Sequence, residues 1–190
     1  MTSTIEQKKL LRKLMNEKNR TLSAEESGRQ SNVLWSKILA DSVFQKAKTI
    51  LFYWSMNDEL ATIKTVNTLY QSKTILLPVI ENNELIIRRF NNIEEMKPEP
   101  KFGILEPTGP LYTDYDKIDI VIVPGLAFDL NCSRMGRGKG YYDKLLKKIP
   151  FAQKYGVGFN HQLIENVPTE EHDISLSSIW TAEKTVMNNV

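Results

Sequence analysis

The stretch VIVPGLAFDLNCSRMGRGKGYYDKLL, residues 121–146, decides the fold that we expect for this chain. Its first residues form a β-branched apolar run, which is typical of a buried strand, and the run stops at Pro124 and Gly125. A polar loop follows, and an apolar-periodic helix begins near Tyr141. A buried strand that leads through a loop into a helix is typical of α/β domains, so this class is predicted.

The loop in this stretch predicts an anion site. Three cations alternate with three glycines, so the backbone can curl with its N–H groups facing one point on which the cations converge. A nucleotide phosphate needs such a cradle, and the free N–H groups and dipole of the following helix would add to the same field. The predicted nucleotide-binding residues of the loop are Arg134, Met135, Gly136, Arg137, Gly138, Lys139, Gly140, Tyr141 and Tyr142.

A glycine-rich basic loop can equally be a flexible, solvated turn, and this spacing fits neither standard phosphate loop. There is no Gly-Lys-Ser/Thr ending, and the glycines at 136, 138 and 140 do not satisfy G-x-G-x-x-G. Asp143 favours the phosphate interpretation. A carboxylate one turn inside the helix is a natural ligand for Mg²⁺, which commonly bridges carboxylate and phosphate oxygens.

Length and composition bound the class of protein. The 190 residues are enough for one domain with a substantial core, and we expect a single domain over residues 1–190. The hydrophobic content of 41% and the charged content of 25% are ordinary globular values. No apolar run approaches the roughly 20 residues that span a membrane, and the N-terminus lacks a signal-peptide core. The one cysteine, Cys132, fits a reducing compartment, so cytoplasmic localisation is expected.

Charge is nearly balanced but unevenly distributed. The formal net charge is +2, while residues 1–20 and residues 129–148 each hold six cations against two acids. Two short basic segments indicate two contributors to one compact anion site rather than the long basic face that duplex binding requires. We therefore expect neither a nucleic-acid partner nor a membrane partner.

Residues 4–20 predict a helix in which Lys8 and Arg12, four residues apart, share a face. Such a pair of cations is commonly just a solvated face. Ser23 and Glu26 have the spacing of a capping box for a second helix, which is expected to end near Ala40. The apolar faces of the two helices are predicted to be Ile5, Leu10, Leu11, Leu14 and Met15, and Val33, Leu34, Ile38 and Leu39.

Residues 49–54 read as a central strand. In open α/β sheets the ligand lies beyond the carboxyl ends of the strands, which places Trp54, Met56 and Glu59 where a substrate could bind. Trp54 could instead be a core residue, and Glu59 could be only a first-turn acid of the next helix, residues 61–71.

The alternation of strands and helices predicts an α/β fold, a single three-layer domain with a largely parallel central sheet flanked by helices, plus an antiparallel hairpin. Asn82 and Asn83 form the expected hairpin turn, and residues 91–117 are expected to be mostly loop. The other expected elements are hairpin strands at 74–80 and 85–90, an ordered segment at 102–107, a strand at 155–159, a helical turn at 161–164, an acidic loop at 167–173 and one last strand at 179–186.

Five segments carry a further pattern: KKLLR from Lys8, WSMNDE from Trp54, PGLAFD from Pro124, RMGRGKGYYD from Arg134, and Val167-Pro168 through His172-Asp173. Together they closely resemble the 5-formyltetrahydrofolate cyclo-ligase family, whose members are also called methenyltetrahydrofolate synthetases. The resemblance runs in order from residue 8 to about residue 173, and the block from PGLAFD to GRGKGYYD is its most specific part.

The resemblance implies an enzyme that uses ATP and Mg²⁺ to convert 5-formyltetrahydrofolate into 5,10-methenyltetrahydrofolate, releasing ADP and phosphate. In the family's mechanism the formyl oxygen attacks the γ-phosphate, and N10 then closes on the activated carbon as phosphate leaves. An amide-like oxygen is a poor leaving group, so phosphorylation must precede ring closure. The protein mainly positions groups and neutralises phosphate charge.

The resemblance also implies roles by position. Arg137 and Lys139 are expected to be catalytic, and the first helix, at Lys8, Lys9 and Arg12, to contact the ATP phosphates. Residues 134–142 match the nucleotide loop. The implied folate-binding residues are Trp54, Met56, Glu59, Arg137, Gly138, Lys139, Gly140 and Tyr141, and the implied Mg²⁺ ligands are Asp143 and Asp173.

Two residues receive no functional role. His172 is expected to be a polar loop histidine, and Cys132 lacks a partner base that would make it a nucleophile. The family commonly has glycine at the position of Cys132, so this larger side chain leaves the conformation of the turn open.

Two alternatives remain on the sequence alone. One is a noncatalytic nucleotide- or RNA-binding module, although its aromatic residues should interleave with basic residues along a sheet, and here they are scattered. The other is a sugar-phosphate isomerase-like enzyme on a similar α/β scaffold, which would turn over without nucleotide.

Overall fold

The computed structural model describes residues 3–99, 103–170 and 173–188. A seven-stranded sheet forms its centre, in the order β11-β10-β9-β6-β1-β2-β3. The four inner pairings are parallel and the two outermost pairings are antiparallel, which confirms the largely parallel sheet. The strands are β1 Thr49–Leu51, β2 Thr74–Glu81, β3 Glu84–Arg89, β6 Ile120–Pro124, β9 Gln153–Val157, β10 Ser178–Trp180 and β11 Thr185–Met187.

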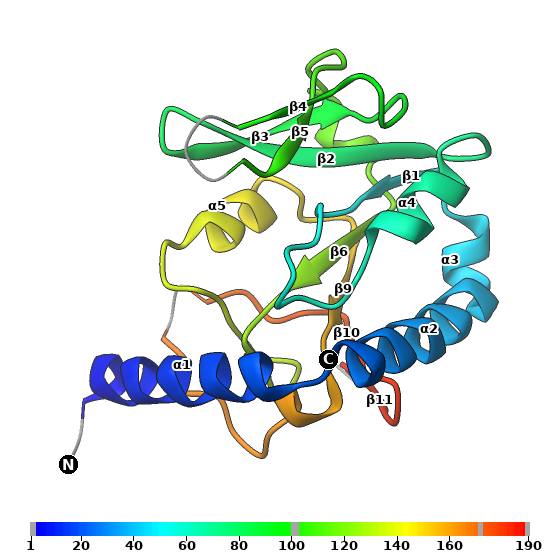
Figure 1. Ribbon diagram of the computed structural model, residues 1–190. Coiled ribbons are helices and arrows are strands. Elements are labelled where there is room, and N and C mark those ends of the chain that lie inside the picture. The colour runs from blue at the N-terminus through cyan, green and yellow to red at the C-terminus, as the bar shows by residue number, and fades with distance from the viewer. Residues whose placement is uncertain (1–2, 100–102, 171–172, 189–190) are drawn as a thin grey trace.

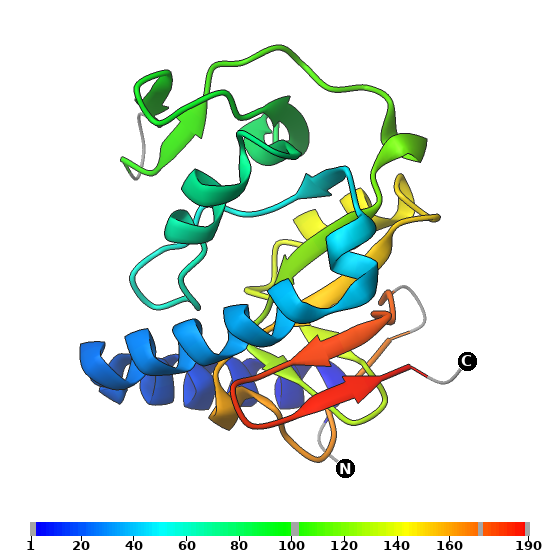
Figure 2. The same ribbon diagram turned by 90° about the vertical axis from the view of Figure 1, so that its right-hand side faces the viewer.

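Helices lie on both faces of this sheet, as Figures 1 and 2 show, with α2 and α3 on one side and α5 on the other. Adjacent residues of a strand point to opposite faces, and Ile50 and Leu51 of β1 belong to two separate apolar clusters. Ile50 packs with Ile38 of α2, and Leu51 packs with Leu145 of α5, so the three layers are confirmed. The helices are α1 Thr4–Thr21, α2 Ala24–Ala40, α3 Ser42–Lys46, α4 Ile63–Leu69 and α5 Tyr141–Lys147, with 3₁₀ turns η1 Tyr115–Lys117 and η2 Asn160–Gln162.

Helix α1 lies across the carboxyl end of the sheet, below β6 and β9 in Figure 1. Its buried Met15 packs against Leu126 and Met135, which follow β6 in the chain. The apolar stripe predicted for this helix is wrong for Ile5, Leu10 and Leu14, which are exposed. The reason is that α1 turns a mixed face inward, where Met15 is accompanied by the buried polar residues Lys8 and Asn19.

The start of α2 also differs from the sequence prediction. The Ser23 hydroxyl accepts a hydrogen bond from the Glu26 N–H at 3.2 Å, but the Glu26 carboxylate binds Arg29 and Gln30, so that the capping box is only half formed. A complete capping box caps α1 instead, between Ser3 and Glu6. On the apolar face of α2, Leu34 and Ile38 are buried, whereas Val33 and Leu39 are exposed.

The segment after β6, predicted to be a polar loop, contains a short hairpin of β7 Ala127–Phe128 and β8 Arg134–Met135. Buried Asp129 caps its turn, because its carboxylate accepts hydrogen bonds from the N–H groups of Asn131, Ser133 and Val167, each at 2.9 Å. Cys132 adopts φ +58° in this turn and is fully buried. The turn thus has the left-handed geometry that glycine favours, although cysteine occupies it.

Several smaller predictions can be compared with the structure. The hairpin of β2 and β3 is confirmed, and its turn residues Asn82 and Asn83 have φ of +48° and +64°. The segment at 91–117 contains one further hairpin, β4 Met96–Pro98 with β5 Leu105–Pro107, while Phe102 of the predicted ordered segment lies outside the described residues. The expected single last strand is two strands, because a turn at residues 181–184 separates β10 from β11.

No helix in the described ranges is long and apolar enough to cross a membrane.

Candidate active site

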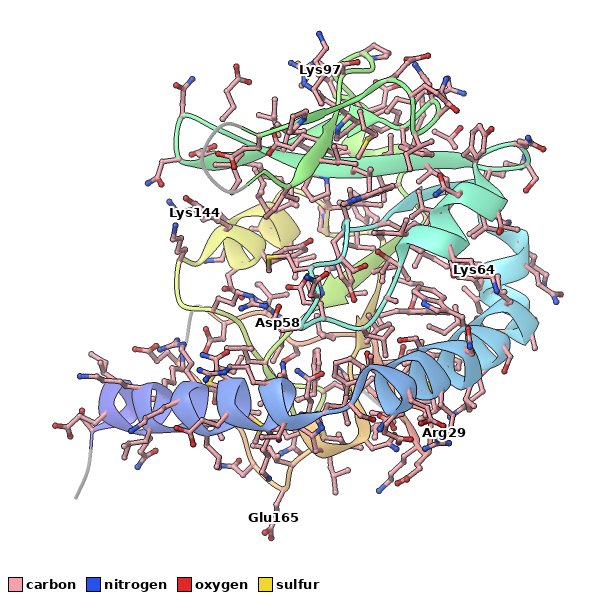
Figure 3. All side chains as sticks on the ribbon, viewed as in Figure 1. Arg29, Asp58, Lys64, Lys97, Lys144 and Glu165 are labelled. Atoms are coloured by element: carbon pink, nitrogen blue, oxygen red, sulfur yellow. The ribbon has the colours of Figure 1, made fainter. Side chains whose placement is uncertain are left out.

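The glycine-rich loop meets the loop after β1 through Arg137. Its Nη2 atom donates to both carboxylate oxygens of Asp58, at 2.8 and 2.9 Å, and to Glu59 Oε1 at 3.3 Å. Figure 3 shows Asp58 in the region between α1 and α5. Strands β6 and β1 are neighbours in the sheet, so the segments that follow their carboxyl ends converge, as the sequence predicted.

Glu59 is held on the loop after β1 by its neighbours. Its Oε2 accepts a hydrogen bond from the Met56 N–H at 3.1 Å, and its side chain is 15% exposed. Burial raises the pKa of Glu59 above its ordinary value, although the Met56 hydrogen bond and the Arg137 charge oppose the shift. Trp54, on the same loop, is half-buried and packs its ring 5.9 Å from that of Phe90. Glu59 is therefore not a solvated first-turn acid, since it precedes α4 by several residues.

Helix α1 approaches the glycine-rich loop through Arg12. The Arg12 Nε donates to the carbonyl oxygen of Gly136 at 3.1 Å. Gly138 has φ +103°, and a Cβ atom there would lie 3.3 Å from the Arg12 guanidinium. The loop backbone and a cation from a distant helix therefore lie in close contact, which a residue with a side chain would disturb.

Lys8 is buried between two carboxylates. Its Nζ lies 2.7 Å from Glu170 Oε2 and 2.7 Å from Asp173 Oδ2. Burial alone would lower the pKa of Lys8, but the hydrogen bonds and charges of Asp173 and Glu170 outweigh it, so the pKa is raised. The solvated-face interpretation of Lys8 is wrong, and two predicted site residues that are 165 positions apart are in contact.

Arg134 is buried with part of its hydrogen-bonding capacity unused. Its Nη2 pairs with Asp143 Oδ1 at 2.9 Å, its Nη1 donates to the Pro124 carbonyl oxygen at 3.2 Å, and its guanidinium lies 5.6 Å from the Tyr142 ring centroid. Its buried Nε has no hydrogen-bond partner among the described residues. An unsatisfied buried donor costs about 1–3 kcal/mol, so a ligand acceptor would find a receptive group here.

A cavity of about 150 Å³ lies between the segment at Arg134 and the segment at residues 169–175. It brings the buried Arg134 and the Lys8-paired acids Glu170 and Asp173 to one surface. Its lining residues are Ser133, Arg134, Thr169, Glu170, Asp173, Ile174 and Ser175.

The two tyrosines that begin α5 have different environments. Burial, assisted by the nearby Glu59 charge, raises the pKa of Tyr142 far above its ordinary value, so its hydroxyl stays protonated. The Tyr141 hydroxyl donates to Asn83 Oδ1 at 2.7 Å and thereby links α5 to the hairpin turn. Exposed Lys139 places its Nζ 5.8 Å from the Tyr141 ring centroid.

Other predicted residues have less direct positions. Lys9 is exposed on α1, and Met135 is buried in the apolar cluster with Met15. Gly140 is the left-handed N-cap of α5. His172 lies outside the described residues.

Two carboxylates that contact predicted cations, Asp58 and Glu170, were not predicted as site residues. Asp58 and Glu170 lie close in sequence to the predicted site residues Glu59 and Asp173. Their positions in the sequence did not show which of these acids would contact the cation.

Comparisons with known proteins show the family to which this chain is similar. A model of the 5-formyltetrahydrofolate cyclo-ligase family matches residues 4–182. The chain is 31% identical over 186 residues to 5-formyltetrahydrofolate cyclo-ligase of Mus musculus, covering 90% of this chain and 92% of the relative. It is 32% identical over 147 residues to the Haemophilus influenzae protein of the same name, covering 71% and 76%.

Two solved structures are also similar to this chain. The NMR structure of Aquifex aeolicus 5,10-methenyltetrahydrofolate synthetase superposes with a TM-score of 0.87 at 32% identity, covering 96% of this chain and 93% of that one. A 5,10-methenyltetrahydrofolate synthetase from Mycoplasma pneumoniae, at 20% identity and a TM-score of 0.73, shows likeness of fold alone. The chain belongs to the 5-formyltetrahydrofolate cyclo-ligase family.

Proposed function

We propose that this chain carries out the ATP-dependent conversion of 5-formyltetrahydrofolate to 5,10-methenyltetrahydrofolate, with release of ADP and phosphate. The observation that carries the proposal is the convergence of four segments, remote in sequence, around Arg137, Arg12, Lys8 and Arg134. The cations come from α1 and the glycine-rich loop, and the acids come from the loop after β1 and from the segment at Glu170 and Asp173. Such an arrangement suits a site where an anionic nucleotide and an amide-bearing substrate react together.

The reaction has two steps. The formyl oxygen attacks the γ-phosphorus, the bond to the β,γ-bridging oxygen breaks, and ADP leaves. N10 then attacks the activated carbon, loses its proton, and phosphate departs with the former formyl oxygen. Little covalent chemistry falls to the protein, so positioning and charge neutralisation are its main tasks.

The cations are assigned to the nucleotide. Lys8, Lys9 and Arg12 of α1 act from one side of the phosphates, and Arg134 acts through its buried guanidinium. Arg137 and Lys139 act at the transferring phosphoryl group, where negative charge must be neutralised as the bond to ADP breaks. The backbone of residues 135–142 lines the nucleotide.

The folate is assigned to the other side of the glycine-rich loop. Glu59 is the acceptor for polar N–H groups of the pterin, while Trp54 and Met56 offer apolar surface on the same loop. Residues 137–141 contact both substrates, which brings the formyl oxygen to the γ-phosphate.

Mg²⁺ is assigned to Asp143 and Asp173. Both are carboxylates that are only 20% and 15% exposed, and each lies beside a cation of the nucleotide site, Arg134 or Lys8. Hard oxygen donors of this kind suit Mg²⁺, which would supply charge neutralisation to the phosphates when bound. We further infer that residues 1–190 act as one catalytic unit in the cytoplasm.

The arrangement does not support an RNA-binding module, and the dependence on nucleotide in the assay below separates the proposed enzyme from a sugar-phosphate isomerase. An RNA-binding module needs a row of stacking aromatics, whereas Trp54 and Tyr141 lie on different elements and pack against Phe90 and Asn83. A sugar-phosphate isomerase would turn over without nucleotide.

The test combines purified protein with 5-formyltetrahydrofolate, Mg²⁺ and ATP, and follows the methenyl chromophore together with ADP. Equimolar methenyl product and ADP are expected. Absence of product, or product formed without ATP, would refute the function.

A further inference from the structure

Asp58 holds Arg137 by hydrogen bonds to one nitrogen of its guanidinium, Nη2. Both Asp58 carboxylate oxygens accept from Arg137 Nη2, at 2.8 and 2.9 Å. Within the described residues, Arg137 Nε and Nη1 make no hydrogen bond. The Nε and Nη1 N–H groups of Arg137 therefore remain available to a bound anion.

The position of Asp58 is itself fixed by α1. Buried Asn19 donates its Nδ2 to the Asp58 carbonyl oxygen at 3.2 Å, and the Asn19 Oδ1 lies 2.7 Å from His161 Nε2. The Asp58 backbone is thus tied to α1 while its carboxylate reaches the glycine-rich loop. Three segments of the site are connected through this one residue.

Asp58 also keeps Arg137 from pairing fully with Glu59. The contact of Arg137 Nη2 with Glu59 Oε1 is 3.3 Å, longer than either contact with Asp58. Charge-assisted hydrogen bonds strengthen as they shorten toward about 2.8 Å, so Asp58 is the preferred partner. Without the Asp58 charge, Glu59 would be the nearest carboxylate left for Arg137.

We propose that Asp58 is a positioning residue, which holds Arg137 toward the phosphoryl group and keeps Glu59 open for the folate. The inference rests on the proposed function and deepens it, because it divides the two neighbouring acids into one that holds a cation and one that receives substrate. Asp58 itself touches neither substrate.

The experiment measures the dissociation constant of 5-formyltetrahydrofolate by isothermal titration, together with KM for each substrate. Asp58→Asn keeps the shape of the side chain but removes its charge. We expect the folate dissociation constant to rise about tenfold and kcat to fall, because Arg137 turns from the phosphoryl group to Glu59, while KM for ATP changes less than about twofold. In an Arg137→Gln background, Asp58→Asn should have less than about a twofold further effect, because its role acts through Arg137.

Glu26→Gln is the matched control. The Glu26 and Arg29 pair lies 2.7 Å apart on α2, outside the site, and Glu26 is 36% exposed where Asp58 is 34% exposed. This variant should bind folate as the wild type does. Its melting temperature, compared with that of Asp58→Asn, separates lost stability from lost positioning.

The outcomes separate the two hypotheses. If the wild type neither binds folate nor turns over, the proposed function fails. If the wild type binds and Asp58→Asn binds equally well, the positioning role alone is refuted. Equal losses from Asp58→Asn in the wild-type and Arg137→Gln backgrounds would also refute it, since Asp58 would then act independently of Arg137.

Discussion

Gly138→Ala tests whether the glycine-rich loop depends on close approach to a cation. Gly138 has φ +103°, a conformation that costs an L-residue about 1–3 kcal/mol. The new Cβ would also lie 3.3 Å from the Arg12 guanidinium, so the guanidinium must shift by a few tenths of an ångström. Its charge-assisted bond to the Gly136 carbonyl, 3.1 Å long, is then weakened, and such bonds contribute about 1.5–3 kcal/mol.

These two effects have different readouts. The backbone strain should lower the melting temperature by about 2–4 °C for each kcal/mol in a chain of this length. Displacement of Arg12 should raise KM for ATP by about tenfold or more, because about 1.4 kcal/mol corresponds to a factor of ten. Steady-state kinetics with saturating 5-formyltetrahydrofolate and a thermal melt measure them separately.

Gly140→Ala is the matched comparison in the same loop. Gly140 has φ +66°, and nothing lies within 4 Å of an added Cβ, so only the left-handed strain of about 1–2 kcal/mol applies. KM for ATP should rise less than about threefold. Gly28→Ala, in the interior of α2 with open space around it, should stabilise the protein by about 0.5–1 kcal/mol and leave activity unchanged. Equal KM values for Gly138→Ala and Gly140→Ala would refute the role of the Arg12 contact.

Three further predictions concern charge and burial. Burial raises the pKa of Glu59 above 4.5, so Glu59 becomes protonated at a higher pH than an exposed glutamate does. We therefore expect kcat/KM for the folate to fall on the acid side of the pH profile, and Glu59→Gln to remove this fall. A pH profile that Glu59→Gln leaves unchanged would exclude a role of ionised Glu59 in folate binding. Lys8→Met removes the cation that Asp173 and Glu170 share, and it should lower the free energy of unfolding in urea by about 1–3 kcal/mol, after allowance for the partial exposure of both acids. Lys8→Arg keeps the charge and should lower it by less than half as much. Equal losses for the two variants would contradict the role of charge pairing. Cys132 is fully buried, and burial raises the pKa of its thiol. A thiol reagent should therefore react with it at least about a hundredfold faster in denaturant than in buffer. Equal reaction rates in the two conditions would show that the turn is open to the reagent.

Local patterns were sufficient to predict much of the fold. The β-branched run at residues 121–123 and the apolar period after Tyr141 predicted β6 and α5, because a continuous apolar run indicates a strand buried on both faces and a helical apolar period indicates a helix buried on one face. The hairpin turn at Asn82 and Asn83 was predictable because these residue types tolerate positive φ.

The errors arose where tertiary contacts overrode local patterns. The apolar period of α1 could not show that Lys8 and Asn19 would be buried and Leu10 exposed, since a polar side chain can be buried when its polar end finds partners in distant segments. The hairpin of β7 and β8 has two residues in each strand, too few for a period, and depends on the capping of its turn by Asp129.

The site was partly predictable for the same reasons. The position of Glu59 and the glycine-rich loop at the carboxyl ends of neighbouring strands followed from the general rule for α/β sheets. The contact of Lys8 with Asp173 spans almost the whole chain, so no local pattern contains it, and only the family resemblance grouped the two residues. The choice of Asp58 over Glu59 as the closer partner of Arg137 depends on a few tenths of an ångström, which sequence cannot specify.

The way α1 is attached has a consequence for exchange of its backbone amides. Met15 is buried in the smallest apolar cluster and Leu11 is partly buried against it, while Lys8, Arg12 and Asn19 make polar contacts to other segments. The helix can therefore separate from the sheet without exposing the two large apolar clusters, at a lower free energy than global unfolding. A nucleotide that binds between α1 and the glycine-rich loop, as proposed, would add its binding free energy to that opening, and amide protection of α1 would then measure how fully the site is occupied.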